Sequence, residues 1–263
     1  MTERADLMMM RDQPQDGAPQ APRASGTTRR VFLRRTATMA ASVALSSVAR
    51  GHATAAERSA GKRCHESVRT IIDTALTSER LATTFYYAGL TTPRIAGRAG
   101  DAHDAEKLSF LRATLAQEHA HAEIWRRLGA TSSHRRFYFP ASSFERLGFT
   151  NHSGTYLWTL DHLETAFAGI YIAALRRLAV LGRDDLAIQS VRMLGVECQH
   201  RALYRVISQD DPADNITLEV DEFPCVDDAT RFLTPFLTGR GFPHGATAAL
   251  YLPTSRQVAH VTA

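Results

Sequence analysis

The sequence predicts an all-α protein built as an antiparallel four-helix bundle with one long crossover. Four long segments place apolar residues at helical spacing and are rich in Ala, Leu, Arg and Glu, which favour helices. The link within the first pair of segments is about a dozen residues long, and the link within the second pair is two or three. The link between the pairs is far longer. Two hairpins joined by a crossover follow from these lengths.

Each of the four segments ends at a proline or glycine, residues that stop helices. The expected helices cover residues 66–90, 104–128, 153–181 and 184–208. The corresponding stop residues are Pro93, Gly129, Gly182 and Pro212. Ser153 and Asp184 are suitable N-caps for the third and fourth helices.

The long crossover runs from residue 129 to 152 and contains Phe137-Tyr138-Phe139-Pro140, which does not have a helical pattern. Its roughly 24 residues, when extended, easily span the ~38 Å length of a 25-residue helix. After residue 211 the helical periodicity fades. We expect a short strand or ordered loop over 216–225, a short helix over 226–238 and irregular chain to Ala263.

The formal charge of +4 belongs to the N-terminal part of the chain. Residues 1–55 hold eight of the 31 Lys and Arg and four of the 27 Asp and Glu, so the remainder carries 23 of each. The body therefore gives no electrostatic reason to expect nucleic acid as a partner. A hydrophobic content of 44% excludes a disordered chain, and no apolar run approaches the ~18 residues of a stable membrane span.

Residues 1–55 have the layout of an export signal. Arg29 and Arg30, followed by Val-Phe-Leu-Arg, precede a 13-residue apolar run over 37–49, and Ala53-Thr54-Ala55 offers a small-x-small cleavage site. The paired arginines resemble a twin-arginine signal, which implies export of a folded chain by the twin-arginine machinery. We expect cleavage near Ala55 and a periplasmic or extracellular location. The domains are then 1–55 as signal, 56–210 as bundle and 211–263 as C-terminal extension.

Three cysteines, Cys64, Cys198 and Cys225, are too few for a disulfide scaffold. One pair can form in an oxidising compartment and would leave the third thiol free, but the sequence leaves the pairing open.

An internal repeat links the two hairpins. Two helices carry a single mid-helix Glu with Tyr seven residues later, and the other two carry Glu-x-x-His with an aromatic residue at +7 and Arg at +8. The repeated pairs are Glu79 with Tyr86, Glu164 with Tyr171, Glu118 with His121 and Glu197 with His200. Such a repeat implies a pseudo-twofold axis between the hairpins.

The repeat predicts a site for two metal ions. Residues three apart share a helix face, about 4.5 Å apart along the axis, so Glu and His can bind one ion together. The lone Glu79 and Glu164 are expected to bridge or complete the two ions, and four carboxylates would neutralise two divalent cations. The alternative is a bundle with four solvated glutamates and two core histidines. The expected ligands are Glu79, Glu118, His121, Glu164, Glu197 and His200.

These residues, on helices between about 66 and 208, resemble the ferritin-like superfamily, whose di-iron and di-manganese members carry this constellation. Within it, the Phe-Tyr-Phe-Pro crossover and the lack of a haem site are most similar to the group of desiccation-related proteins. The resemblance implies ferroxidase, peroxidase, oxygenase or catalase chemistry and does not choose among them.

Three further side chains are candidates near this site. Tyr86 and Tyr171 lie two turns after a candidate ligand and are candidate catalytic residues, as hydrogen-bond donors or a redox relay. Core tyrosines with satisfied hydroxyls are the alternative. Asp161 is a candidate for orienting a ligand imidazole, with a surface acid as the alternative.

Oxygen-rich ligation with two imidazoles predicts iron or manganese, with zinc as a further alternative. The expected function is an exported di-metal oxidoreductase that reacts with O₂ or peroxide in oxidative or desiccation stress, with metal ions or a small-molecule oxidant as partners. The alternatives are a non-catalytic metal-binding stress or envelope protein and a metal-free interaction module. The sequence leaves the electron donor and the oligomeric state open.

Overall fold

The computed structural model describes residues 64–96, 102–147, 155–207, 222–242 and 246–263 of the 263. The export signal expected over residues 1–55 lies outside the described residues. So do the candidate N-cap Ser153 and most of the segment 216–225, for which we expect a strand or loop.

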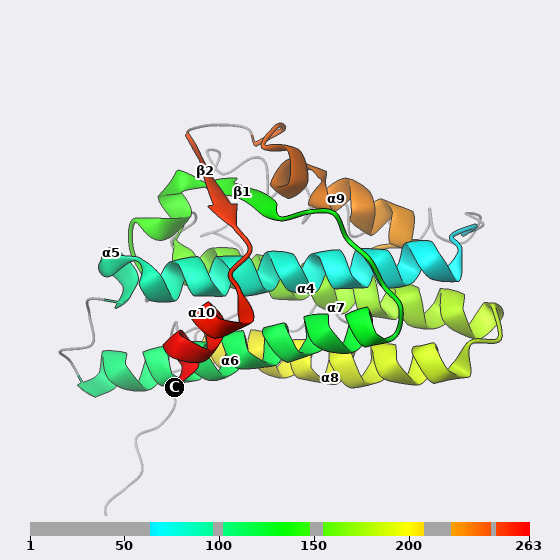
Figure 1. The fold of residues 1–263 in the computed structure, drawn as a ribbon, viewed down its shortest axis with the longest axis horizontal. Coiled ribbons are helices and arrows are strands. Elements are labelled where there is room, and N and C mark those ends of the chain that lie inside the picture. The colour runs from blue at the N-terminus through cyan, green and yellow to red at the C-terminus, as the bar shows by residue number, and fades with distance from the viewer. Residues whose placement is uncertain (1–63, 97–101, 148–154, 208–221, 243–245) are drawn as a thin grey trace, which may run out of the picture. The chain divides into compact units, whose positions relative to one another are not determined.

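Four long helices form the bundle, and the expected all-α architecture is confirmed (Figure 1). They are α4 (Val68–Thr91), α6 (Ala102–Arg127), α7 (Tyr156–Val180) and α8 (Asp184–Ile207). The helix α4 packs along α6, and α7 packs along α8, as two hairpins. A single turn, α5 (Pro93–Ala96), follows α4. Beyond the ends of α6 and α7, Gly129 and Gly182 adopt φ angles of 93° and 67°, which favour glycine.

Hydroxyl side chains begin two of these helices. The Ser67 hydroxyl accepts the Thr70 N–H at 3.1 Å before α4, and the Thr155 hydroxyl accepts the Trp158 N–H at 3.4 Å before α7. Asp184, expected as an N-cap, is instead the first residue of α8. There its carboxylate lies in the first turn, where the helix dipole stabilises a negative charge.

The C-terminal extension is more ordered than the sequence predicts. The helix α9 (Val226–Thr238) matches the expected range, but the expectation of irregular chain after it is wrong. This part of the chain contains strand β2 (Thr247–Tyr251) and helix α10 (Ser255–Thr262). Because β2 pairs with β1 (Arg136–Pro140) more than a hundred residues earlier, its stability does not show in the local pattern.

The crossover and the extension together pack on three helices of the bundle, α4, α6 and α7. The strand β1 lies in the Phe-Tyr-Phe-Pro segment, pairs antiparallel with β2 and leads into a short 3₁₀ turn, η1 (Ala141–Phe144). The helix α9 contacts β1, α7 and α4, whereas α10 contacts α6 and α4 (Figure 1). The four bundle helices are therefore not equally exposed.

An aromatic cluster attaches the crossover to α4. The Phe85 ring lies 4.7 Å from Phe139 and 4.9 Å from Tyr156, measured between centroids, and it stacks on Tyr156. Tyr156 also lies so close to Gly89 that a Cβ at this glycine would overlap its ring. The first residue of α7, Tyr156, can therefore pack against α4 because Gly89 has no side chain.

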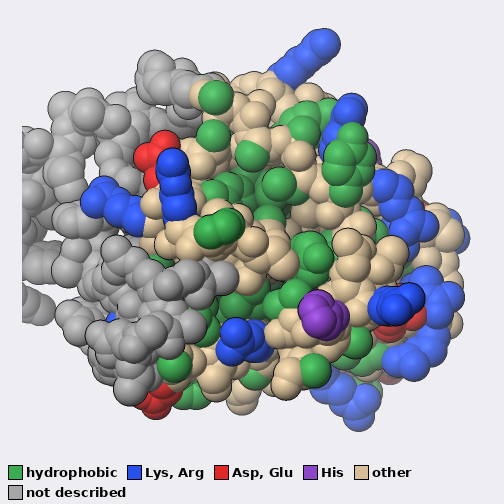
Figure 2. Space-filling model, turned by 60° about the vertical axis from the view of Figure 1, so that its left-hand side comes forward, with side chains coloured by type: hydrophobic (Ala, Val, Ile, Leu, Met, Phe, Trp, Pro, Cys, Tyr) green, Lys and Arg blue, Asp and Glu red, His purple; other side chains and the backbone are tan. Residues whose placement is uncertain are grey.

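None of the described helices combines the length and apolar character that crossing a membrane requires. On the face shown in Figure 2, Lys and Arg side chains lie at separate places among hydrophobic and neutral polar ones, and acidic side chains are few.

Candidate metal centre

The fold brings the six expected ligands together at mid-bundle. Each of the four helices contributes at least one of them, and all six are buried. The exposed fractions are 0% for Glu118, Glu164 and Glu197, 2% for Glu79, 3% for His200 and 7% for His121. Burying four carboxylates without compensating charge costs several kcal/mol for each ion, so this cluster calls for cations.

The ligands form two overlapping groups of four residues. One consists of Glu79, Glu118, His121 and Glu197, and the other of Glu118, Glu164, Glu197 and His200. Within each group the donor atoms lie within 4.8 Å of one another. Glu118 and Glu197 belong to both groups, so the shared carboxylates come from the two Glu-x-x-His helices. Of the two roles expected for Glu79 and Glu164, bridging or completing the ions, this grouping favours completing, since each belongs to one group only.

The imidazoles present Nδ1 to the carboxylates. Nδ1 of His200 lies 2.8 Å from Glu118 Oε1 and 3.5 Å from Glu197 Oε2. Nδ1 of His121 lies 3.4 Å from Glu79 Oε2 and 3.6 Å from Glu197 Oε1. The two rings are nearly parallel, with centroids 6.4 Å apart. Each half of the centre therefore contains one imidazole nitrogen among carboxylate oxygens.

Eight buried polar atoms of these six residues have no hydrogen-bond partner among the described residues. They are Glu79 Oε2, Glu164 Oε2, both oxygens of Glu118 and of Glu197, and Nδ1 of His121 and His200. Although His200 and Glu118 approach closely, their geometry makes no hydrogen bond. Native proteins rarely leave one such atom unsatisfied, so eight facing one another fit bound metal.

The electrostatics of the cluster point the same way. Burial, with the charges of Glu197 and Glu79, raises the pKa of Glu118 well above its usual range. Burial and the charge of Glu197 do the same to the pKa of Glu164. Burial alone would lower the pKa of His121, but the charge of Glu79 and the close polar contacts with Glu197 and Glu79 outweigh it and raise this pKa to about 11. Without metal the cluster retains protons, because burial disfavours charged carboxylates and the carboxylates repel one another.

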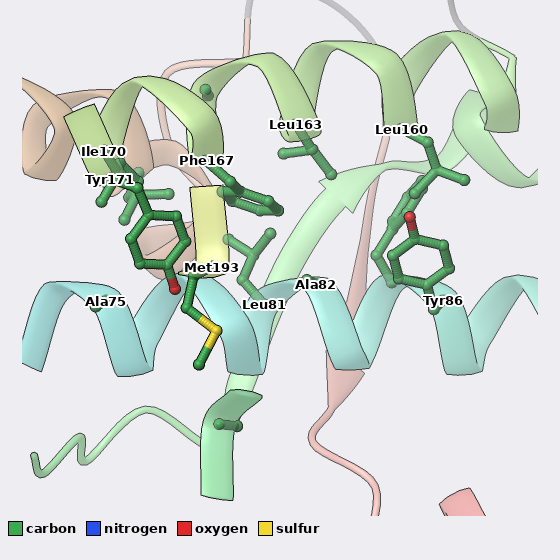
Figure 3. Packing of buried hydrophobic residues seen from close by; sticks show 14 of the residues in the cluster. Ala75, Leu81, Ala82, Tyr86, Leu160, Leu163, Phe167, Ile170, Tyr171 and Met193 are labelled. Atoms are coloured by element: carbon green, nitrogen blue, oxygen red, sulfur yellow. The ribbon is translucent and has the colours of Figure 1, made fainter. Parts of the chain in front are cut away.

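The two candidate tyrosines contact the ligands of the opposite hairpin. Tyr86 of α4 donates a 2.6 Å hydrogen bond to Glu164 Oε1 of α7, and Tyr171 of α7 donates one to Glu79 Oε1 of α4. Both tyrosines are fully buried. Figure 3 shows them at either end of an apolar layer in which residues of α7 face α4. The tyrosine hydroxyls thus bind Oε1 of Glu164 and Oε1 of Glu79, whereas Oε2 of each glutamate is among the eight atoms without a partner.

The aromatic residues at +7 in the Glu-x-x-His helices stand behind these tyrosines. Trp125 Nε1 donates a 3.0 Å hydrogen bond to the Tyr171 hydroxyl, and the Tyr204 ring lies 6.0 Å from the Tyr86 ring, between centroids. The sequence repeat predicts that Trp125 and Tyr204 occupy equivalent positions, but it does not predict that each of them contacts a tyrosine of the other hairpin.

A residue that the sequence did not single out orients one imidazole. Nε2 of His200 lies 2.7 Å from Oε1 of Gln117, an exposed residue of α6. Asp161, expected in such a role, instead faces Arg205 at 3.3 Å and Arg201 at 3.7 Å. Gln117 immediately precedes Glu118 and points to another face of its helix, so spacing on α6 alone could not identify it. Only the approach of α8 brings His200 to it.

The fold and this centre define the class of four-helix bundles with a buried carboxylate and imidazole cluster suited to metal. Residues 67–210 match the ferritin-like domain, and the chain belongs to that family. No curated protein and no solved structure matches the chain.

Proposed function

We propose that this chain is an exported di-metal carboxylate protein that binds two iron or manganese ions and reacts with O₂ or peroxide in oxidative or desiccation stress. The observation that carries the proposal is the set of eight buried, unpartnered donor atoms. Hydrogen bonding leaves these atoms free, and two divalent cations would satisfy them.

The donor set divides between two ions. Glu79 with His121 would hold one ion, and Glu164 with His200 the other, while Glu118 and Glu197 serve both, in keeping with the two groups of donors. Four carboxylate charges balance two divalent cations. Oxygen donors with two imidazoles and no thiolate favour iron or manganese over soft metals.

The residues around the ligands suit redox chemistry with a small oxidant. Bound iron or manganese supplies electron exchange with O₂ or peroxide. Tyr86 and Tyr171 each hold a proton on the hydroxyl beside a ligand carboxylate and fix one of its oxygens, which leaves the other for metal. Buried apolar residues such as Leu163 and Phe167 exclude water from the space between α4 and α7 (Figure 3).

Export is part of the proposal and rests on two features. The first is the resemblance of residues 1–55 to a twin-arginine signal. The second is the disulfide between Cys64 and Cys225, which are 161 residues apart, whereas Cys198 is a free thiol. Structural disulfides are typical of proteins from oxidising compartments such as the periplasm.

The test begins with protein purified from the export compartment. We expect two iron or manganese ions per chain by elemental analysis, and consumption of O₂ or peroxide that depends on the metal. Metal without any turnover would overturn the oxidoreductase and leave the non-catalytic metal-binding protein. A folded protein without metal, and unable to take it up, would overturn the proposal as a whole.

A further inference from the structure

A second cluster of metal-ligating side chains lies away from the bundle centre, where the start of α4 meets the start of α9. It consists of Cys64, Glu66 and Cys225, whose donor atoms lie within 4.8 Å of one another. Glu66 is 4% exposed and Cys225 is 2% exposed. The two cysteines form a disulfide with Cα atoms 5.5 Å apart, so the sulfur atoms are not available to metal in the oxidised chain.

Glu66 has one oxygen in use and one without a partner. Its Oε1 accepts the Asp227 N–H at 2.9 Å, in the first turn of α9. Its Oε2 is buried and has no hydrogen-bond partner in the part of the chain that the structure describes. A buried carboxylate oxygen without a donor is costly. The hydrogen bond to α9 explains the position of Glu66, but it does not explain why Oε2 is buried without a hydrogen-bond donor.

Cys225 lies at a place that favours a thiolate. It is the N-cap of α9, and its sulfur accepts the N–H of Asp228. Backbone N–H groups and the helix dipole at such a position stabilise negative charge on a sulfur. Reduction of the disulfide would therefore place a nucleophilic, metal-binding sulfur beside the unused oxygen of Glu66.

We propose that reduction of the Cys64–Cys225 disulfide creates a second metal site, in which two thiolates and the Glu66 carboxylate bind a thiophilic divalent cation such as Zn²⁺. A dithiol reductant supplies two electrons and two protons, the S–S bond breaks, and the reductant itself becomes a disulfide. Binding of the cation then displaces the two thiol protons. Thiolate donors select zinc-like cations, so this site differs in metal preference from the oxygen-rich centre of the bundle. The inference does not depend on the proposed function.

Cobalt(II) is the probe, because a thiolate–cobalt bond gives a charge-transfer band in the near ultraviolet and carboxylate or imidazole ligands do not. The full chain is titrated with Co²⁺ in the oxidised form and after reduction with a phosphine, which delivers two electrons while taking oxygen from water. We expect the band only in the reduced protein, saturating at one thiolate-bound ion per chain. A reduced protein that shows no band overturns the proposal.

Three variants separate this site from other sources of the signal. Cys198→Ser removes the free thiol and should keep the band, whereas Cys64→Ser should abolish it. Glu66→Gln retains the oxygen that accepts from Asp227 but loses the charge, and we expect it to weaken cobalt binding about tenfold or more. Loss of the band in Cys198→Ser, or unchanged affinity in Glu66→Gln, contradicts the assignment. Far-ultraviolet circular dichroism shows that each variant keeps its helices.

Discussion

Glu118 has both carboxylate oxygens buried among other acids, so the cost of burying it depends on which positive charges neutralise these acids. Its neighbours Glu79 and Glu197 are also buried, and the two histidines lie within ion-pair distance of these carboxylates. A side chain of this kind contributes little to folding by itself. Its position fits the proposed role as a ligand shared by two metal ions.

Glu118→Gln keeps the shape of the side chain and removes one shared ligand charge. We expect the metal content to fall below two ions per chain and the rise in melting temperature on adding metal to be largely lost, because stabilisation by a ligand follows its affinity. Elemental analysis and calorimetry with and without metal measure both quantities. Glu123→Gln is the matched control, since this acid is 38% exposed and pairs with Arg126. A variant that retains two ions would contradict the shared role of Glu118.

Gln117→Leu tests the orientation of one imidazole. The amide oxygen of Gln117 holds an Nε2–H of His200, which leaves Nδ1 as the donor on the metal side. Partners of this kind typically change metal affinity 10–100-fold, so we expect a loss of about that size at the ion bound by His200 and Glu164. Stepwise calorimetric titration should show one step weakened and the other unchanged. In Gln199→Leu, which alters another exposed glutamine, both steps should remain.

Among the elements, those with local signals were predicted well and those that depend on distant partners were not. The four bundle helices lie within about three residues of the expected ranges, because periodicity and stop residues such as Gly129 are local. The strand β2 and the helix α10 were missed. β2 has only five residues and depends on pairing with β1, and the residues near β2 in the sequence give no sign of this distant pairing.

The contact between α4 and α7 depends on one glycine. Gly89→Ala would place a methyl group in the Tyr156 ring, so the ring or the helix must shift. We expect a loss of about 1–3 kcal/mol in the free energy of unfolding, typical of overpacking. Gly195→Ala is the control, because this glycine lies within α8 with nothing near its Cβ position. That substitution should stabilise by about 0.5–1 kcal/mol. Chemical denaturation measures both, and equal effects would refute the close packing.

At the scale of the whole molecule, the sequence places the six candidate ligands on the right helix faces but not relative to one another. Helical spacing is enough to group Glu118 with His121 and Glu197 with His200. The sharing of two carboxylates, the crossed tyrosines and the contact of Gln117 all arise between helices. Spacing along one helix says nothing about distances between helices, so these contacts could be found only in the structure.

Removal of metal should weaken the whole bundle, because the two proposed ions would connect all four helices. Binding of each ion at 100 times its Kd adds about 2.7 kcal/mol to the stability of the folded state. We expect a chelator to lower the melting temperature, and manganese or iron to restore it, with the disulfide kept oxidised throughout. Identical melting curves with and without metal would exclude two tightly bound ions.

The crossed contacts have a consequence for assembly. Each hairpin supplies three ligands to its own half of the centre, but it lacks the shared carboxylate and the tyrosine that complete that half. A hairpin on its own therefore offers an incomplete coordination set. Binding of the proposed ions would therefore be coupled to docking of the two hairpins, and the metal content of a preparation would report the fraction of chains in which the hairpins are correctly docked.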